Sequence, residues 1–193
     1  MAENLEDMSL EDLWQLFPIF LEEHNKDWPA WYKEESRRIQ SFLPANQLYE
    51  MHHIGSTSIE GIWAKPIIDI LLEIPRSEDM ESIKRKLLEH GYLLMSESEG
   101  RMSFNKGYTL QGFAERVFHL HLRYYGDHDE LYFRDYLQDR PAVAKDYEQL
   151  KLTLWKKYEH NRDAYTEAKT EFIRQYTQKA HKLYEGRYDD KLA

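Results

Sequence analysis

Residues 66–72 form the run Pro-Ile-Ile-Asp-Ile-Leu-Leu, which limits the folds that this chain can adopt. A short run that is apolar at nearly every position is typical of a β-strand whose two faces are both covered by other elements. Asp69 interrupts this run. A carboxylate in that setting is costly unless it binds a metal, a cation or hydrogen-bond donors. We therefore expect a fold built from helices and a sheet, with Asp69 as a functional residue.

The segment before this strand is rich in hydroxyl groups, because Gly55 is followed by Ser56, Thr57 and Ser58. This composition suits a loop whose backbone N–H and side-chain O–H groups face an anion. An ordinary polar turn has the same composition and is the alternative. Together with Asp69, the loop predicts a phosphate-binding cradle beside a metal ligand.

Two histidines alternate with apolar residues in the stretch 116–124, which predicts a strand with one core face. His119 and His121 then lie on the other face, roughly 6.6 Å apart. With Asp69 they offer two imidazoles and a carboxylate, a set that can bind zinc, manganese or iron. Two half-exposed strand histidines are the alternative interpretation.

Four basic side chains are candidates for contact with a bound phosphate: Lys65, Arg116, Arg123 and Lys169. Lys65 directly precedes the buried strand, where it could pair with Asp69 or reach a ligand phosphate. Arg116 and Arg123 flank the histidines and could clamp an anion or pair with surface carboxylates. Lys169 lies on an expected helix. A solvated amine is the alternative for both lysines.

Length, charge and cysteine content bound the class of protein. The 193 residues suffice for one domain with a proper core and a helical appendage. The chain has no cysteine, which excludes disulfides, thiolate metal sites and cysteine nucleophiles. The net charge of −9 argues against general nucleic-acid binding but allows a local basic pocket for a small anion. An acidic N-terminus and the lack of a long apolar span predict a cytoplasmic protein without membrane contact.

The periodicity of apolar residues and the positions of Gly and Pro predict the elements. Helices are expected near 9–17, 29–42, 77–91, 131–137, 141–158 and 163–180, and strands near 47–54, 67–74, 92–95, 101–108 and 116–124. Ser77 and Asp163 are the expected caps of two of these helices. We expect an N-terminal helical extension over 1–27, an α/β core over 28–126 and a C-terminal helical region over 127–193.

Several blocks resemble one known family. Residues 52–74, HHIGSTSIEGIWAKPIIDILLEI, are very similar to the signature HIGSTSVPGLxAKPIIDI of the GrpB (glutamate-rich protein B) family, and FHLHL at 118–122 resembles its paired-histidine strand. Residues 132–155 and 163–173 also resemble that family, so the match runs from about Trp28 to Ala180. The resemblance implies an α+β, nucleotidyltransferase-like fold, with a small mixed sheet, flanking helices and a C-terminal helical bundle.

The resemblance also implies roles for individual residues. Gly55 and Ser56 match the pair that holds nucleotide phosphates, and Asp69 matches the first metal-binding carboxylate. His119 and His121 fall where the superfamily would place a further acidic ligand. The implied cofactor is a divalent metal, either Mg, Mn or Zn.

The chain departs from the active-enzyme pattern at the second acidic position. Nucleotidyltransferases usually carry another acid two residues after the first, and here that residue is Leu71. Glu73 lies on the same strand face but roughly 13 Å from Asp69. Two-metal catalysis needs ions about 3.5–4 Å apart, so Glu73 is a poor substitute.

Three functions remain open at this point. The first is transfer of a nucleotidyl or phosphoryl group to an unknown small acceptor, with Asp69 and Lys65 as catalytic residues. The second is a binding module for a nucleotide or coenzyme that has lost its chemistry, which Leu71 favours. The third is a metal-dependent phosphohydrolase using the histidines. Because some family members are fused to dephospho-coenzyme A kinase, the resemblance also implies a link to coenzyme A biosynthesis.

Overall fold

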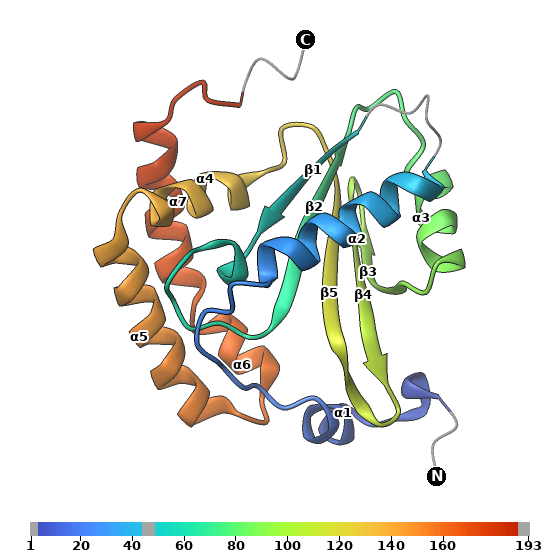
Figure 1. Cartoon of the computed structure of the whole chain (residues 1–193), viewed down its shortest axis with the longest axis horizontal. Helices are drawn as coiled ribbons and strands as arrows, with labels where there is room; N and C mark the ends of the chain where they lie inside the picture. The colour runs from blue at the N-terminus through green and yellow to red at the C-terminus, as the bar shows by residue number, and fades with distance from the viewer. Residues whose placement is uncertain (1–3, 44–48, 189–193) are drawn as a thin grey trace.

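The computed structural model describes residues 4–43 and 49–188, and its centre is a five-stranded mixed sheet (Figure 1). The strands are β1 (Glu50–Ile54), β2 (Ile67–Ile74), β3 (Leu93–Ser98), β4 (Arg101–Thr109) and β5 (Gly112–Tyr124), in the spatial order β1-β2-β5-β4-β3. β2 and β5 pair in parallel, whereas the other neighbouring strands pair antiparallel. Both parallel strands therefore have a neighbour on each side.

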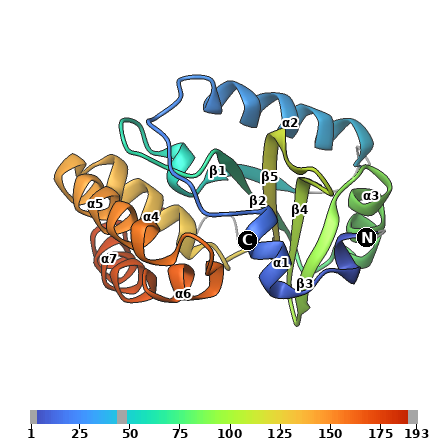
Figure 2. The ribbon, with the colours of Figure 1, turned by 90° about the horizontal axis from the view of Figure 1, so that it is seen from below.

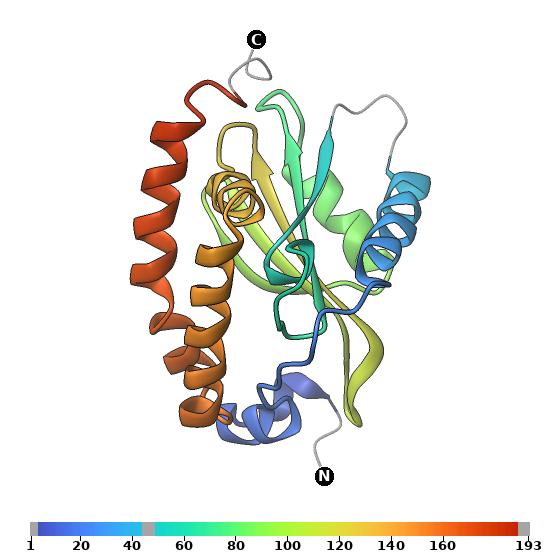
Figure 3. The same cartoon turned by 60° about the vertical axis from the view of Figure 1, so that its left-hand side comes forward.

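Helices cover both faces of the sheet. They are α1 (Leu10–Leu16), α2 (Trp28–Phe42), α3 (Met80–Glu89), α4 (Asp129–Gln138), α5 (Pro141–Tyr158), α6 (Arg162–Glu167) and α7 (Thr170–Leu183), with 3₁₀ turns η1 (Leu5–Asp7) and η2 (Ser56–Ser58). Figure 2 shows α4 to α7 grouped beside the sheet, with α2 across its other face. Figure 3 shows the sheet between α4, α5 and α7 on one side and α2 and α3 on the other. Over the described residues, no helix is both long and apolar enough to cross a membrane.

The two faces of β2 carry different side chains because successive residues of a strand point to opposite sides. Ile68, Ile70 and Leu72 belong to the main core with residues of α2 and α3. Leu71 points the other way and packs with Leu131 of α4. The expectation of a strand covered on both faces, in an α+β fold with C-terminal helices, is confirmed. Asp69 lies on the face of the C-terminal helices.

Two expected helix starts were wrong. The third helix begins at Met80 because the Asp79 carboxylate accepts hydrogen bonds from the N–H groups of Glu81 and Ser82, at 3.0 and 3.1 Å. Ser77 instead lies in a turn, which is closed by a hydrogen bond from the N–H of Glu78 to the C=O of Pro75 at 3.0 Å.

The last expected helix is two helices. Asn161 caps α6, because its side-chain oxygen accepts from the N–H of Ala164 at 3.0 Å, so Asp163 lies inside the first turn. A break at Ala168 and Lys169 separates α6 from α7. The first strand is described from Glu50, and residues 47 and 48 of the expected strand lie outside the described residues.

Candidate functional site

The parallel pairing of β2 and β5 brings three candidate residues together. Asp69 is the register partner of His119, and His121 lies two residues farther along β5. One carboxylate oxygen, Asp69 Oδ1, lies 3.5 Å from His119 Nδ1 and 3.3 Å from His121 Nε2. A single oxygen therefore faces both imidazole rings.

These contacts set the charge of the carboxylate. Burial by itself raises the pKa of Asp69, but its hydrogen bonds and charge interactions with His119 and His121 outweigh burial and hold that pKa well below the usual range. Burial lowers the pKa of His119. The Nε2 atom of His119 lies 2.8 Å from the hydroxyl of Tyr108, which orients the ring with Nδ1 toward Asp69.

The donor chemistry of this trio fits a divalent ion. Two imidazole nitrogens and a carboxylate suit zinc or manganese, whereas magnesium prefers oxygen ligands. Asp69, His119 and His121 are the residues that would hold such an ion. In the part of the chain that the structure describes, however, no group of three or more His, Asp or Glu side chains has the arrangement of a metal site.

The glycine loop packs directly on this carboxylate. Gly55 has φ 71° and ψ −176°, and a Cβ atom there would lie 3.0 Å from both Cβ and Cγ of Asp69. Ser58 Oγ donates to the C=O of Gly55 at 2.6 Å, and Thr57 Oγ1 donates to the C=O of Ile67 at 3.2 Å. These two hydroxyls therefore hold the loop in shape. Ser56 also lines the cavity beside the loop, and its side chain forms a hydrogen bond with Tyr147.

That cavity has a volume of ≈ 240 Å³ and lies between the sheet, the loop and the C-terminal helices. The residues that line it are Ser56, Thr57, Lys65, Ile67, Asp69, His119, Lys151, Tyr165, Thr166 and Lys169. It thus joins the carboxylate and one histidine to three lysines. Two of these lysines share an aromatic ring, since the Nζ atoms of Lys65 and Lys169 lie 4.8 and 4.3 Å from the ring centroid of Tyr165.

The lysines are poorly solvated. Burial lowers the pKa of Lys65 and of Lys151 to about 7, and that of Lys169 to about 8, and neighbouring cations add to each shift. Lys151 is 2% exposed and donates to the C=O of Trp63. Cations held in a partly dry cavity attract anions more strongly than solvated ones, because the local dielectric constant is lower. The cavity is therefore suited to an anionic group.

The two candidate arginines lie elsewhere. Side chains alternate along β5, so Arg116 lies on the face opposite to His119 and His121, which is the α2 side of the sheet. There it forms an ion pair with Glu34, and its guanidinium lies 5.2 Å from the ring centroid of Trp31. Arg123 is buried and donates to the C=O groups of Met102 and Leu122 at 3.2 and 3.1 Å. Neither arginine lines the cavity.

Two further cations near the cavity, Lys151 and Arg162, were not predicted from the sequence. Lys151 occupies the apolar face of α5, in the i, i+3, i+4 series with Ala144, Tyr147 and Leu154, all of them buried. A lysine on the apolar face of an expected helix is a pattern visible in the sequence, and it could have identified Lys151. Arg162 begins α6, and its charge lowers the pKa of Lys65, Lys169 and His119, which places it beside the same cavity.

Known proteins are similar to this chain in sequence and in fold. Residues 18–179 match the family described as GrpB protein. The glutamate-rich protein GrpB of Alkalihalophilus pseudofirmus is 33% identical over 161 residues, covering 80% of this chain and 91% of that protein. The UPF0157 protein YqkA of Bacillus subtilis is 32% identical over 85% of this chain, which spans about half (48%) of YqkA.

Solved structures agree with the sequence comparison. The conserved protein GrpB from Enterococcus faecalis is 30% identical and matches with a TM-score of 0.74, covering 86% of this chain and 99% of that one. A weaker likeness, at 12% identity and a TM-score of 0.48, is to the Cid1 poly(U) polymerase with MgGTP bound, covering 77% of this chain and 47% of that one. The family match spans most of the chain and includes the glycine loop, Asp69 and both strand histidines, so the chain belongs to the GrpB family.

Proposed function

We propose that this chain binds the phosphates of a nucleotide in the cavity beside Asp69 and transfers a nucleotidyl or other phosphoryl group to a small acceptor. The observation that carries the proposal is the cavity itself, where three lysines face the glycine loop and a carboxylate held by two histidines. Catalysis of phosphoryl transfer is mostly positioning and charge neutralisation, which is what such a set of groups supplies.

Each group has a role in this proposal. Lys151 and Lys169 neutralise the phosphate oxygens, and the turn at Gly55 and Ser56 lets the backbone approach them. Asp69, His119 and His121 would hold a divalent ion, which supplies Lewis-acid stabilisation when bound.

In nucleotidyl transfer, an acceptor hydroxyl attacks the α-phosphorus, a new P–O bond forms, and the bond to pyrophosphate breaks. The proton of the hydroxyl passes to a base. Lys65 has a pKa lowered to about 7 by burial, so a useful fraction of its amine is unprotonated near neutral pH and able to accept that proton.

A binding module without turnover is the second candidate, and Leu71 favours it. The side chain at the position of the usual second acid is 0% exposed and packs with Ile54 and Leu131, so this position is part of an apolar cluster and supplies no second carboxylate. The two functions differ in whether bound nucleotide is converted to product.

The test combines ligand binding with turnover. Wild-type protein is screened by thermal shift and product analysis with nucleoside triphosphates and dephospho-coenzyme A, each with Mg, Mn, Zn or no metal. Asp69→Asn and His121→Ala are compared with Asp146→Asn, which alters an exposed carboxylate of α5.

We expect a metal-dependent stabilisation that the first two variants lose and Asp146→Asn keeps, because a ligand selective for the folded state raises its stability. Product formation would establish the transferase, and stabilisation without product would establish the binding module. Release of inorganic phosphate alone would indicate a hydrolase. If no nucleotide or coenzyme precursor shifts the wild type under any metal condition, the proposal is wrong.

A further inference from the structure

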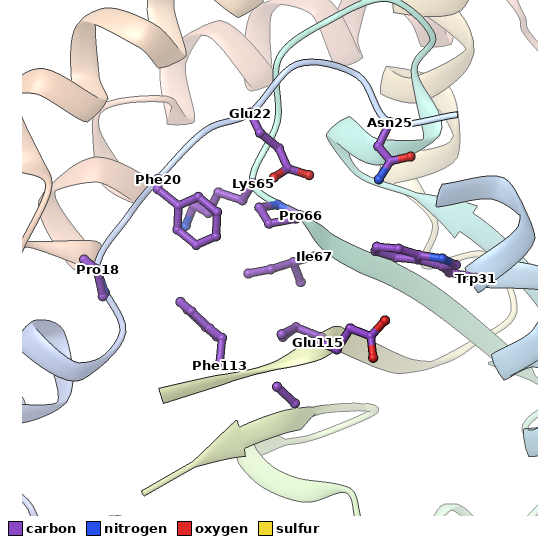
Figure 4. Close-up of a pocket in the computed structure, with 12 residues that line it drawn as sticks. Pro18, Phe20, Glu22, Asn25, Trp31, Lys65, Pro66, Ile67, Phe113 and Glu115 are labelled. Carbon is purple, nitrogen blue, oxygen red and sulfur yellow. The ribbon is translucent and has the colours of Figure 1, made fainter. Parts of the chain in front are cut away.

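A second cavity, of ≈ 320 Å³, adjoins the first one (Figure 4). The two cavities share Lys65 and Ile67 in their walls. The second one lies between β5, α2 and the segment 18–25 that links α1 to α2. A ligand there would therefore lie next to a group bound beside Asp69.

The wall formed by segment 18–25 is fixed to the rest of the molecule. The N–H of Glu22 donates to the C=O of Ala64 at 2.9 Å, and the N–H of Ala64 donates to the C=O of Glu22 at 3.0 Å. Farther back, the rings of Phe20 and Phe113 meet edge to face with centroids 6.1 Å apart. The cavity is thus held open by backbone pairing and an aromatic contact.

The lining is aromatic and acidic. Phe20, Trp31 and Phe113 provide three rings, and Figure 4 shows Phe20 and Phe113 on one side of Ile67 and Trp31 on the other. Glu22 and Glu115 bring two carboxylates to the same space. Among the residues described, neither carboxylate forms an ion pair with a Lys, Arg or His side chain. Arg116, which lies over Trp31, is paired with Glu34.

The two cavities therefore differ in charge. The first cavity concentrates lysines and favours anions, whereas the second carries two carboxylates and only Lys65, which it shares with the first. Burial raises the pKa of Glu22, so removal of this carboxylate from water has a cost that a bound cation would relieve. Aromatic faces attract flat apolar groups and organic cations alike.

We propose that the second cavity binds a small organic cation with a flat aromatic body, its ring against Phe20, Trp31 and Phe113 and its positive charge balanced by Glu22 and Glu115. Small-molecule sites are typically concave and mostly apolar, with a few polar groups that fix the orientation of the ligand. The binding of this ligand does not depend on the function proposed above. Its role as the acceptor of the transferred group does rest on that function.

The test uses three indole compounds that differ mainly in charge. Tryptamine is a cation, indole-3-ethanol is neutral and indole-3-acetate is an anion at neutral pH. Binding of each is measured by isothermal titration calorimetry. The location of binding is measured from chemical-shift changes at the backbone amides of residues 22 and 64. Glu22→Gln and Glu115→Gln are compared with Glu23→Gln, which alters an exposed neighbour that does not line the cavity.

We expect tryptamine to bind, indole-3-ethanol to bind more weakly and indole-3-acetate not to bind. Each of Glu22→Gln and Glu115→Gln should weaken tryptamine binding by roughly tenfold, the change expected when one charge-assisted contact is lost. Glu23→Gln should not change it. Equal binding of the three compounds, or unchanged affinity in both cavity variants, would overturn the proposal.

Asp69→Asn separates this proposal from the proposed function. The variant should retain tryptamine binding while it loses metal-dependent nucleotide binding, because Asp69 lines only the first cavity. If tryptamine binds and no nucleotide binds, the second cavity is a cation site and the transferase proposal is wrong. If nucleotides bind and tryptamine does not, the reverse holds.

Discussion

Gly55 lies so close to Asp69 that a Cβ atom on the glycine would stand 3.0 Å from both Cβ and Cγ of the aspartate. The loop can pass over the carboxylate only because residue 55 has no side chain. The same residue has φ 71° and ψ −176°, a backbone conformation found almost only in glycine. Glycine is therefore required at this position for two reasons, its backbone conformation and its close contact with Asp69.

Gly55→Ala should lower the free energy of unfolding by about 1–3 kcal/mol from backbone strain alone, and should also displace the Asp69 carboxylate. Gly61→Ala is a matched control, because Gly61 has φ 77° but a Cβ atom added there would meet nothing within 4 Å. Denaturant unfolding should show that both variants are destabilised. Nucleotide binding should be lost only in Gly55→Ala, and equal loss in both would contradict the role given to the close contact.

Lys151→Met should weaken the binding of tripolyphosphate by about tenfold or more, because it removes one cation from the first cavity. Lys145→Met is the control, since Lys145 is exposed on the same helix and donates to the C=O of Gly61 at 2.7 Å. Calorimetric titration measures both. Similar affinity in Lys151→Met and the wild type would show that Lys151 does not contribute to anion binding.

Anion binding in the first cavity should weaken as the pH rises from 6 to 9. The pKa of Lys65 and Lys151 is lowered to about 7 and that of Lys169 to about 8, so all three amines are mostly charged at the low end of this range and mostly neutral at the high end. Each pH unit above a pKa lowers the charged fraction about tenfold. Sulfate suits the measurement because its own charge is constant over this range. A pH-independent affinity would contradict the lowered pKa values.

The buried pair of Glu73 and His128 should make stability depend on pH. His128 Nδ1 lies 2.8 Å from Glu73 Oε1, and this hydrogen bond raises the pKa of His128. Because the pKa of His128 is higher in the folded state than in the unfolded state, its protonation stabilises the fold. This stabilisation is fully present below the pKa of an unfolded histidine, about 6.5, and is lost as the pH rises through the pKa of His128 in the folded protein.

The free energy of unfolding should therefore fall as the pH rises through the neutral range, and fall less in His128→Gln, which has no titrating ring. His160→Gln, an exposed histidine, should behave like the wild type. Identical pH profiles in all three proteins would show that the pair does not titrate between the folded and unfolded states.

Local sequence patterns were enough to predict the central strand and the face on which the two strand histidines lie. The continuous apolar run predicted β2 over Ile67–Ile74, and alternation predicted that His119 and His121 share one face with Val117. The same alternation already placed Arg116 on the opposite face, although its closeness to the histidines made it a candidate. Helix caps were less certain, since Ser77 and Asp79 both precede α3 and only hydrogen bonding decides between them.

Which cations surround Asp69 depends on how distant elements pack together, and local sequence patterns do not specify this packing. Arg123 shares the face of the histidines, but its register partner is Glu73, at the far end of β2 from the glycine loop. Lys151 and Lys169 come from α5 and from the turn before α7, 82 and 100 residues after Asp69 in the chain. Strand alternation and glycine geometry are local properties that a sequence carries directly, whereas the position of these helices depends on long-range packing against the sheet.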